Sequence, residues 1–174
     1  MVLCRDTSVN KTENLFAIKI MNKKELKARK FGKAGENAYD CVLEELKVLA
    51  RLEHPNVIWL HEIIDDEKKS CIYLVTEYHA KGSIGDLIKI MNDLANIQCS
   101  SPTKKNIRKG LKMVDCRLYL IDMLKALYYC HKTVKVIHRD IKPDNIMINH
   151  NNEAVLIDFG VSALLEDKKD DPSK

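Results

Sequence analysis

The chain has 174 residues, of which 45% are hydrophobic and 31% charged, with a formal net charge of +4. These values predict a globular protein of one domain or two small lobes, and they argue against disorder throughout. No run reaches the roughly 18 to 20 consecutive apolar residues of a membrane span, and the first residues lack an apolar signal core, so we expect a cytoplasmic location, with the nucleus as the alternative and no membrane partner.

The six cysteines are dispersed, without a C-x-x-C pair or a histidine at zinc-finger spacing. We therefore expect reduced, mostly buried thiols. Two basic runs, residues 22–33 and 104–112, supply much of the positive charge. Neither has a nucleic-acid reading motif, so we expect no nucleic-acid partner and interpret both runs as solvated faces. Docking of an acidic partner is the alternative for these runs.

The pattern of the first half of the chain predicts mostly strands, with one helix. The runs MVLC and LFAIKI predict a hairpin across a polar turn. The spacing of Val42, Leu46 and Leu49 predicts a helix that is ended by the HPN sequence around Pro55. The runs VIWLHEII and CIYLVTEY, on either side of the charged turn DDEKKS, predict two more strands.

After Tyr78 the pattern becomes more helical. Residues 82–97 predict a short amphipathic helix, and a polar linker leads to a long, largely apolar helix over residues 111–131. Two short strands, NIMI and AVLI, flank the polar turn NHNNE. Strands and helices that occupy different parts of the sequence predict an α+β fold.

The segment VIHRDIKPDNIMINHNNEAVLIDFG, residues 136–160, carries many charges among strand-like apolar residues. Charges beside a core need a ligand or counter-ions to offset their desolvation. Carboxylate and amide oxygens suit Mg²⁺ that is shared with phosphates. The polar side chains concerned are Asp140, Lys142, Asp144, Asn145 and Asp158.

Here the sequence resembles the protein kinase family, whose catalytic loop reads H-R-D-x-K-x-x-N and whose metal motif reads D-F-G. Every position of both motifs is filled, by residues 138–145 and 158–160. The resemblance covers essentially the whole chain. It implies a two-lobe kinase fold, with a partial upper lobe over residues 1–78 and a partial lower lobe over residues 79–174. It also implies ATP and Mg²⁺ as cofactors and a protein as substrate.

The resemblance assigns roles to the residues of the two motifs. Asp140 would orient the substrate hydroxyl and accept its proton, while Lys142 would neutralise charge on the transferred phosphoryl group. Asn145 and Asp158 would hold the metal ions. A lysine two positions after the aspartate is typical of serine/threonine kinases, so we expect Ser or Thr hydroxyls as acceptors.

The same resemblance extends into the first half of the chain. The strand FAIKI supplies Lys19, with Ala17 placed to touch the adenine, and the following helix supplies Glu45 as the partner of Lys19. An ion pair between Lys19 and Glu45 would aim the lysine at the phosphates. Its neighbour Glu44 would face solvent.

The stretch YLVTEYHAKGS resembles the last strand of the upper lobe and the hinge between the lobes. Thr76 would be the small residue beside the adenine pocket, and the backbone carbonyl of Glu77 and amide of His79 would bind the adenine edge. Met147 would lie under the adenine, and Asp144 is also expected to bind the cofactor. An apolar column coupling the lobes would consist of Leu49, Leu60, His138 and Phe159, although Leu49 and Leu60 are equally well explained as plain core.

Arg139 before Asp140 resembles kinases that are activated by phosphorylation of the segment after DFG. The lysines after FAIKI and the run DFGVSALLED resemble the calcium/calmodulin-dependent kinases and the kinases upstream of them. A regulatory partner of the calmodulin type, or an upstream kinase, is therefore a hypothesis.

Two parts of the kinase pattern have no counterpart in the sequence: the glycine loop expected before Met1, and the A-P-E motif and helices expected after the last residues. We therefore expect the long apolar helix over residues 111–131 to have an exposed face. An incomplete gene prediction, a natural truncation and a piece of a longer protein stay open as explanations, with the first and third favoured. An ATP-dependent serine/threonine kinase is the first functional hypothesis, and a non-catalytic kinase fragment that binds a partner is the second.

Overall fold

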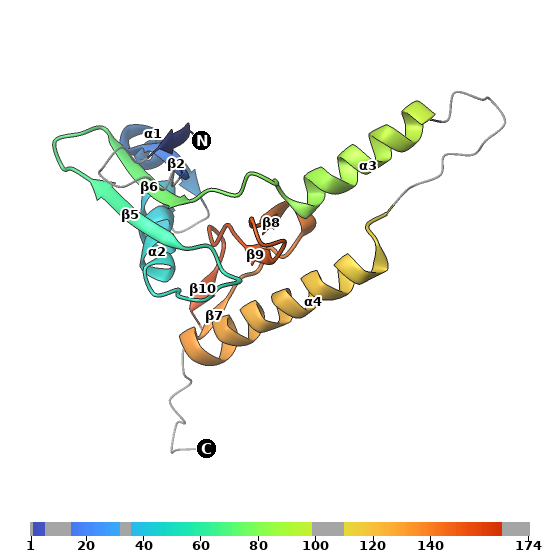
Figure 1. Ribbon diagram of the computed structural model, residues 1–174. Coiled ribbons are helices and arrows are strands. Elements are labelled where there is room, and N and C mark those ends of the chain that lie inside the picture. Colours follow the sequence, from blue (N-terminus) through green and yellow to red (C-terminus); the bar gives the residue numbers. More distant parts are fainter. Residues whose placement is uncertain (1, 6–14, 32–35, 99–109, 165–174) are drawn as a thin grey trace, which may run out of the picture.

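The computed structural model describes residues 2–5, 15–31, 36–98 and 110–164. The first half is built on a four-stranded antiparallel sheet in the order β1-β2-β6-β5 (Figure 1). Its strands are β1 (Val2–Arg5), β2 (Leu15–Asn22), β5 (Leu60–Asp65) and β6 (Cys71–Glu77). The hairpin expected from MVLC and LFAIKI is confirmed by the antiparallel pair β1 and β2. The strand expected from CIYLVTEY is also confirmed, and it pairs with β2, with Ala17 opposite Thr76 in the register. The polar turn expected between the first two strands lies outside the described residues.

Between β2 and β5 the chain forms α1 (Lys23–Ala28), the short pair β3 (Lys30–Phe31) and β4 (Glu36–Asn37), and α2 (Ala38–Leu49). Of these four elements, only α2 was expected from the sequence. Both helices start at an asparagine whose side chain caps the first turn: Asn22 Oδ1 accepts from the Lys24 amide at 2.9 Å, and Asn37 Oδ1 accepts from the Asp40 amide at 3.0 Å. No residue of α1 is buried, as expected of a solvated basic run.

The strand expected from Val57 onward begins only at Leu60, so that prediction was wrong at its start. The backbone of Val57 and Ile58 turns away from the sheet and pairs with the second half of the chain. The Ile58 amide donates to the carbonyl of Leu156 at 2.9 Å, and the Leu156 amide donates to the carbonyl of Asn56 at 2.9 Å.

The second half consists mainly of helices and very short strands. The helices are α3 (Ile84–Gln98) and α4 (Met113–Tyr128), and a π-helical turn (Tyr129–Val134) continues α4. The hairpin of β8 (Ile146–Ile148) and β9 (Ala154–Leu156) is confirmed, and a 3₁₀ turn (Pro143–Asn145) precedes it. The pair of β7 (Val136–Ile137) and β10 (Ala163–Leu164) was not predicted.

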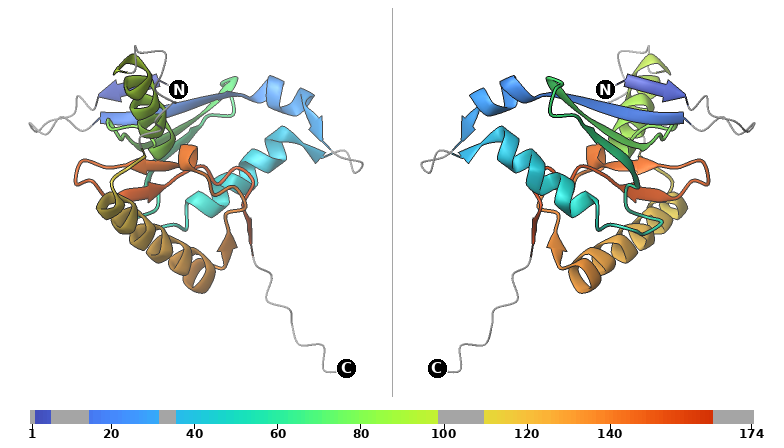
Figure 2. Two further views of the ribbon diagram at one scale, coloured as in Figure 1. Left: turned by 90° about the vertical axis from the view of Figure 1, so that its right-hand side faces the viewer. Right: turned by 90° about the vertical axis from the view of Figure 1, so that its left-hand side faces the viewer.

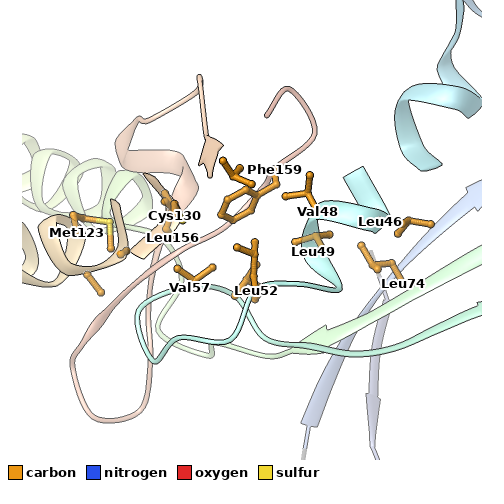
Figure 3. Close-up of a cluster of buried hydrophobic side chains, with 14 of the residues drawn as sticks. Leu46, Val48, Leu49, Leu52, Val57, Leu74, Met123, Cys130, Leu156 and Phe159 are labelled. Carbon is orange, nitrogen blue, oxygen red and sulfur yellow. The ribbon is translucent and has the colours of Figure 1, made fainter. Parts of the chain in front are cut away.

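The sheet with α2 lies on one side of the molecule and α4 on the other, with the β8–β9 hairpin between them (Figure 2). One hydrophobic cluster connects these parts. Phe159 lies between Val48 and Leu49 of α2 on one side and Cys130 and Leu156 on the other (Figure 3). The segment that follows the DFG aspartate is therefore packed against both halves of the chain.

The loop after α2 is fixed to the second half by polar contacts. The Tyr129 hydroxyl accepts a hydrogen bond from the Glu53 amide at 2.8 Å and donates one to the carbonyl of Arg51 at 3.3 Å. The His54 ring stacks on Tyr129, with centroids 5.0 Å apart. The buried side chain of Asn56 donates to the carbonyl of Ala154 at 2.9 Å.

The outer face of α4 is exposed, as the sequence predicted. Only Met123 and Ala126 of this helix are buried. No described helix is long and apolar enough to cross a membrane. The large apolar side chains of α4 that remain exposed are Met113, Val114, Leu118, Leu120, Ile121, Leu124 and Tyr128.

The expectation of mostly buried cysteines was wrong. Cys130 is buried, and its burial raises the pKa of its thiol to about 11. Cys41 and Cys116 are exposed because they lie on the solvent faces of α2 and α4. Cys4 and Cys71 are intermediate, and all five are free thiols, while Cys99 lies outside the described residues.

Candidate functional site

A cavity of about 260 Å³ opens between the sheet and the β8–β9 hairpin. Seven of the residues expected at a nucleotide site line it: Ala17, Lys19, Glu45, Thr76, Glu77, His79 and Met147. Asp158 and Phe159 lie at the same cavity. The cavity therefore brings together side chains from β2, α2, β6, the hinge, β8 and the DFG segment.

Lys19 and Glu45 meet at this cavity. The Lys19 Nζ lies 3.5 Å from the Glu45 Oε1. The Glu45 side chain is 7% exposed and that of Lys19 is 44% exposed, so the carboxylate is held within the fold while the lysine reaches solvent. Glu44 behaves differently, because its exposed carboxylate pairs with Lys47 at 2.6 Å along the helix surface.

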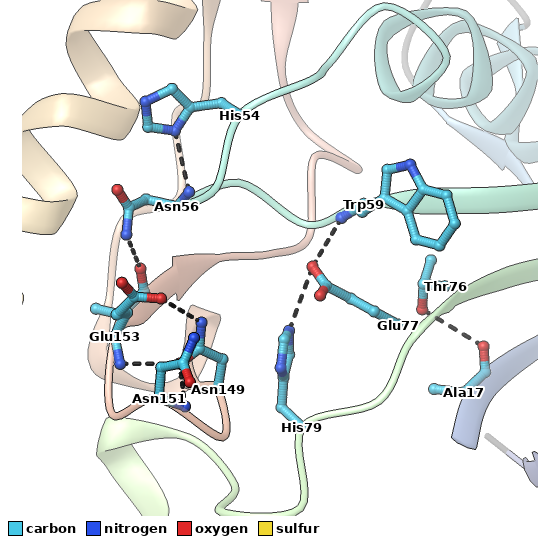
Figure 4. A network of polar contacts seen from close by, with 11 residues as sticks. Ala17, His54, Asn56, Trp59, Thr76, Glu77, His79, Asn149, Asn151 and Glu153 are labelled. Carbon is cyan, nitrogen blue, oxygen red and sulfur yellow. Dashed lines mark hydrogen bonds and ion pairs between the residues drawn. The ribbon is translucent and has the colours of Figure 1, made fainter. Parts of the chain in front are cut away.

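Small residues line the cavity where it meets β2 and β6. Ala17 is buried, and the Thr76 hydroxyl donates to the carbonyl of Ala17 at 3.4 Å (Figure 4). Leu74 and Ile58 add apolar surface that sequence analysis did not include. The alternation of β6 could have indicated Leu74, since it points to the same face as Thr76.

The loop from His138 to Asn145 holds three polar side chains in direct contact. The Lys142 Nζ donates to Asp140 Oδ2 at 2.6 Å. The buried Asn145 side chain donates to the same oxygen at 2.9 Å and to the Asp140 carbonyl at 2.9 Å. The Asp140 carboxylate is therefore fixed by two donors from its own loop. These three residues lie outside the cavity lining.

These contacts set the charges of the group. The hydrogen bond from Lys142 is the largest effect and lowers the pKa of Asp140; burial opposes it, and the hydrogen bond from Asn145 lowers the pKa further. The hydrogen bond to Asp140 raises the pKa of Lys142, and Asp158 and Asp144 raise it further. Both side chains are thus charged at neutral pH, and Asp140 keeps lone pairs that can accept a proton.

Buried contacts orient the backbone around this group. The His138 ring is fully buried, and its Nε2 lies 2.8 Å from the carbonyl of Ile157. Its ring packs edge-on against Phe159, with centroids 4.7 Å apart. Arg139 and Asp158 have φ values of 68° and 63°, which non-glycine residues adopt rarely and which often mark functional sites. Leu49 belongs to the hydrophobic cluster that also contains Phe159, and Leu60 packs against this cluster.

The oxygen donors fit a magnesium ion that is shared with phosphates. Mg²⁺ usually takes one or two carboxylates from a protein and its other ligands from phosphates and water. Asp158 supplies a carboxylate at the cavity, and Asn145 an amide oxygen in the neighbouring loop. Among the described residues no group of three or more His, Cys, Asp and Glu could hold a metal by itself. Asn145 and Asp158 would therefore hold the ion together with a bound nucleotide.

Asp144 lies apart from the other expected cofactor-binding residues. Its exposed carboxylate faces α3, with Oδ1 3.4 Å from the Lys89 Nζ. A side chain at Gly85 would meet that oxygen, because a Cβ there would lie 2.8 Å from it. Asp144 is absent from the cavity lining, so its place beside α3 does not favour a contact with the adenine end of a nucleotide.

The side chains of Glu77 and His79 also belong to the site, although the resemblance implied a role only for their backbone atoms. His79 is buried, and Glu77 Oε1 accepts a hydrogen bond from the Trp59 amide at 2.9 Å (Figure 4). A histidine followed by alanine within a polar stretch gives no periodic signal of burial.

Comparison with known proteins identifies the family. The family model of the protein kinase domain matches residues 4–173. A probable serine/threonine-protein kinase of Dictyostelium discoideum is 36% identical over 156 residues, which cover 90% of this chain and 19% of that protein. The serine/threonine-protein kinase ssp1 of Schizosaccharomyces pombe is 36% identical over 161 residues, which cover 92% of this chain and 21% of that protein.

A calcium/calmodulin-dependent protein kinase kinase of Caenorhabditis elegans is 31% identical over 170 aligned positions, gaps included, and the match covers 88% of this chain and 28% of that protein. The chain thus spans between 19% and 28% of the length of these three relatives. The match extends over both motifs and over the Lys19 and Glu45 positions. This chain therefore belongs to the protein kinase family.

Proposed function

We propose that this chain is the central part of a catalytic domain that transfers the γ-phosphoryl group of ATP to Ser or Thr hydroxyls of proteins. One observation carries the proposal: Asp140, Lys142 and Asn145 form a hydrogen-bonded group whose lysine is within electrostatic reach of Asp158 at the cavity. On this proposal residues 1–78 belong to the upper lobe and residues 79–174 to the lower lobe. The expected cytoplasmic location stays a proposal.

The residues of the loop divide the chemistry between them. Asp140 would accept a hydrogen bond from the substrate hydroxyl and orient it for attack, and it would take the proton as the new bond forms. Lys142 remains protonated beside it and would offset negative charge on the transferred group. The buried Asn145 fixes the Asp140 carboxylate.

The residues of the cavity would hold the nucleotide. Lys19, directed by Glu45, would contact its phosphates, and the backbone of Glu77 and His79 would bind the adenine edge between Ala17 and Met147. Mg²⁺ held by Asn145 and Asp158 would neutralise phosphate charge. The apolar lining at Leu74 and Ile58 would exclude water from the base.

The regulation that we propose follows the family pattern. Arg139 is exposed next to Asp140, where a phosphate on the following segment could pair with it. The similarity to a calcium/calmodulin-dependent protein kinase kinase supports the calmodulin-related branch that the sequence suggested. A calmodulin-type partner or an upstream kinase is part of this proposal.

The test is phosphate transfer by the full-length protein that contains this sequence. We expect transfer to serine- and threonine-containing protein substrates, with most activity lost in Lys19→Ala and Asp158→Ala. Glu44→Gln is the matched control, because its carboxylate lies on the solvent face of α2. Unchanged phosphorylation by both alanine variants would contradict the proposal.

A second function is favoured by the exposed apolar face of α4, which could bind a partner without catalysis. The purified 174-residue chain distinguishes the two functions. Phosphate transfer by this chain that Asp140→Asn abolishes would rule out a purely non-catalytic module. Nucleotide-independent partner binding without any transfer would favour it.

A further inference from the structure

Trp59 is the single tryptophan of the sequence, and its side chain is 48% exposed. Tryptophan is highly buried on average, and exposed aromatic side chains are enriched where proteins bind one another. The backbone of Trp59 is nevertheless fixed, because its amide donates to Glu77 Oε1 at 2.9 Å and its carbonyl accepts from the Glu77 amide at 3.3 Å (Figure 4). The fold therefore presents this indole to solvent from a fixed position.

Two grooves meet at the Trp59 side chain. The first has a volume of about 490 Å³, and its lining includes Glu53, His54 and Glu77. The second has a volume of about 340 Å³, and its lining includes Glu53 and, from β5, Glu62. Trp59 and Glu53 line both grooves, so the two are adjacent. Neither lining contains a residue of the HRD or DFG motif, so this surface is separate from the proposed catalytic residues.

The charged residues of the two linings are mainly carboxylates. Glu53 and Glu62 are exposed, and neither has an ion pair within the described part of the chain. Glu77 is one-third exposed. Arg51 is the one lysine or arginine in either lining, and burial, followed by a neighbouring lysine, lowers the pKa of His54, which is therefore neutral at pH 7. The grooves thus carry negative charge in a chain whose net charge is +4.

We propose that the two grooves bind an extended segment of a partner protein that carries arginines at alternate positions. A guanidinium can stack on an indole while it donates to carboxylates, and Trp59 with Glu53 offers both interactions. Alternate side chains of an extended segment point the same way, so two arginines can enter the two adjacent grooves. The sequence has no two arginines at this spacing, so the segment comes from another protein rather than from a second copy of this chain.

The test measures binding of the acetylated peptide Ala-Arg-Ala-Arg-Ala to the full chain at neutral pH and physiological ionic strength, where long-range attraction between charges is screened. The control peptide has citrulline in place of arginine, which keeps the shape and removes the charge. We expect the arginine peptide to bind about tenfold more tightly and to change the fluorescence of Trp59. Equal binding of the two peptides, or unchanged fluorescence, overturns the proposal.

Variants locate the binding, with the anisotropy of a labelled arginine peptide as the measurement. Trp59→Leu should weaken binding about tenfold, and Glu53→Gln about three- to tenfold. Glu67→Gln is the matched control, because it removes the same charge from an exposed turn residue that lines neither groove, and it should bind as the wild type does. Equal weakening in Glu53→Gln and Glu67→Gln would show general charge attraction and overturn the site. Wild-type affinity in a Trp59→Leu protein with an unchanged melting temperature would do the same.

Sedimentation velocity of the chain without peptide tests a second copy as the occupant of the grooves. We expect the same oligomeric state in the wild type and in Trp59→Leu at every concentration. A concentration-dependent dimer that Trp59→Leu abolishes would assign the grooves to a second copy and overturn the partner assignment. None of these measurements involves phosphate transfer, so the proposal and the proposed function are tested separately.

Discussion

The two charged groups of the site are built in different ways. Asp140, Lys142 and Asn145 lie within six consecutive residues and are joined by hydrogen bonds of 2.6 and 2.9 Å. Lys19 and Glu45 are 26 positions apart and meet through a single contact of 3.5 Å. The first group is organised by its own loop, whereas the second depends on how α2 packs against the sheet. Local substitutions should therefore disable the first group, and core substitutions should disturb the second.

The largest effect is expected for Asp140→Asn. Asparagine keeps the shape of aspartate but cannot accept the proton, so kcat should fall by about 10²–10⁴-fold. Nucleotide affinity and melting temperature should stay close to those of the wild type, because the cavity does not include this residue. The measurement is steady-state phosphorylation together with thermal unfolding. A variant with wild-type kcat would remove Asp140 from the chemistry.

Leu49→Ala tests the dependence of the second group on packing. Leu49 is 3% exposed and lies one turn after Glu45 in α2. The substitution should lower the free energy of unfolding by roughly 2–5 kcal/mol and weaken the Lys19–Glu45 pair. Chemical denaturation measures the change, with Ile90→Ala on the exposed face of α3 as the control, expected within about 0.5 kcal/mol of the wild type. Equal losses in both variants would contradict this interpretation.

Lys142→Ala separates charge from position in the first group. The lysine lowers the pKa of Asp140, so its removal should raise that pKa toward the ordinary value. The acidic limb of the kcat/KM profile should then move to higher pH, and kcat should fall about 10²-fold through loss of the positive charge.

The same lowered pKa of Asp140 also determines how the stability of the folded protein depends on pH. A lowered pKa in the folded state stabilises the protein above the unfolded pKa, and this contribution is lost as the pH falls through the folded value. The control for Lys142→Ala is Lys142→Arg. It keeps the positive charge, so the acidic limb of its kcat/KM profile should lie close to that of the wild type. An unmoved limb in Lys142→Ala would show that another group controls it.

The smallest effect is expected for Glu45→Gln. Loss of one charge-assisted hydrogen bond should lower kcat/KM about tenfold through the position of Lys19. Because the Lys19 side chain is 44% exposed, the free energy of unfolding should change by less than about 1 kcal/mol. Glu44→Gln, on the neighbouring exposed position, should change neither quantity, and equal losses of activity in the two variants would refute the assignment of Glu45.

Much of the architecture could be predicted from the sequence because it depends on local patterns. The alternation of β6, the helical spacing of α2 and the motifs at residues 138–145 and 158–160 are all local signals. The pairing of Lys19 with Glu45 could be named only through the resemblance, since spacing does not show which side chains meet across 26 positions.

The remaining features depend on contacts that the sequence does not display. The buried His79 lies beside Glu77, whose carboxylate is held by the Trp59 amide from a distant part of the chain. The late start of β5 results from backbone hydrogen bonds between Ile58 and Leu156. Asp144 faces Lys89 because Gly85 allows α3 to approach the loop. The predicted roles of the site residues remain predictions until the substitutions are made.

The contacts of the loop after α2 have a consequence for motion. Residues 51–58 are hydrogen-bonded to Tyr129, Ala154 and Leu156, so we expect this part of the chain to move together with the second half. The chain returns to the sheet at Trp59 and leaves it again at Glu77, and these two residues are hydrogen-bonded to each other. A rotation of the sheet over α4 would therefore turn about an axis near Trp59 and Glu77, and its amplitude would grow with distance along β2 and β6 from that pair.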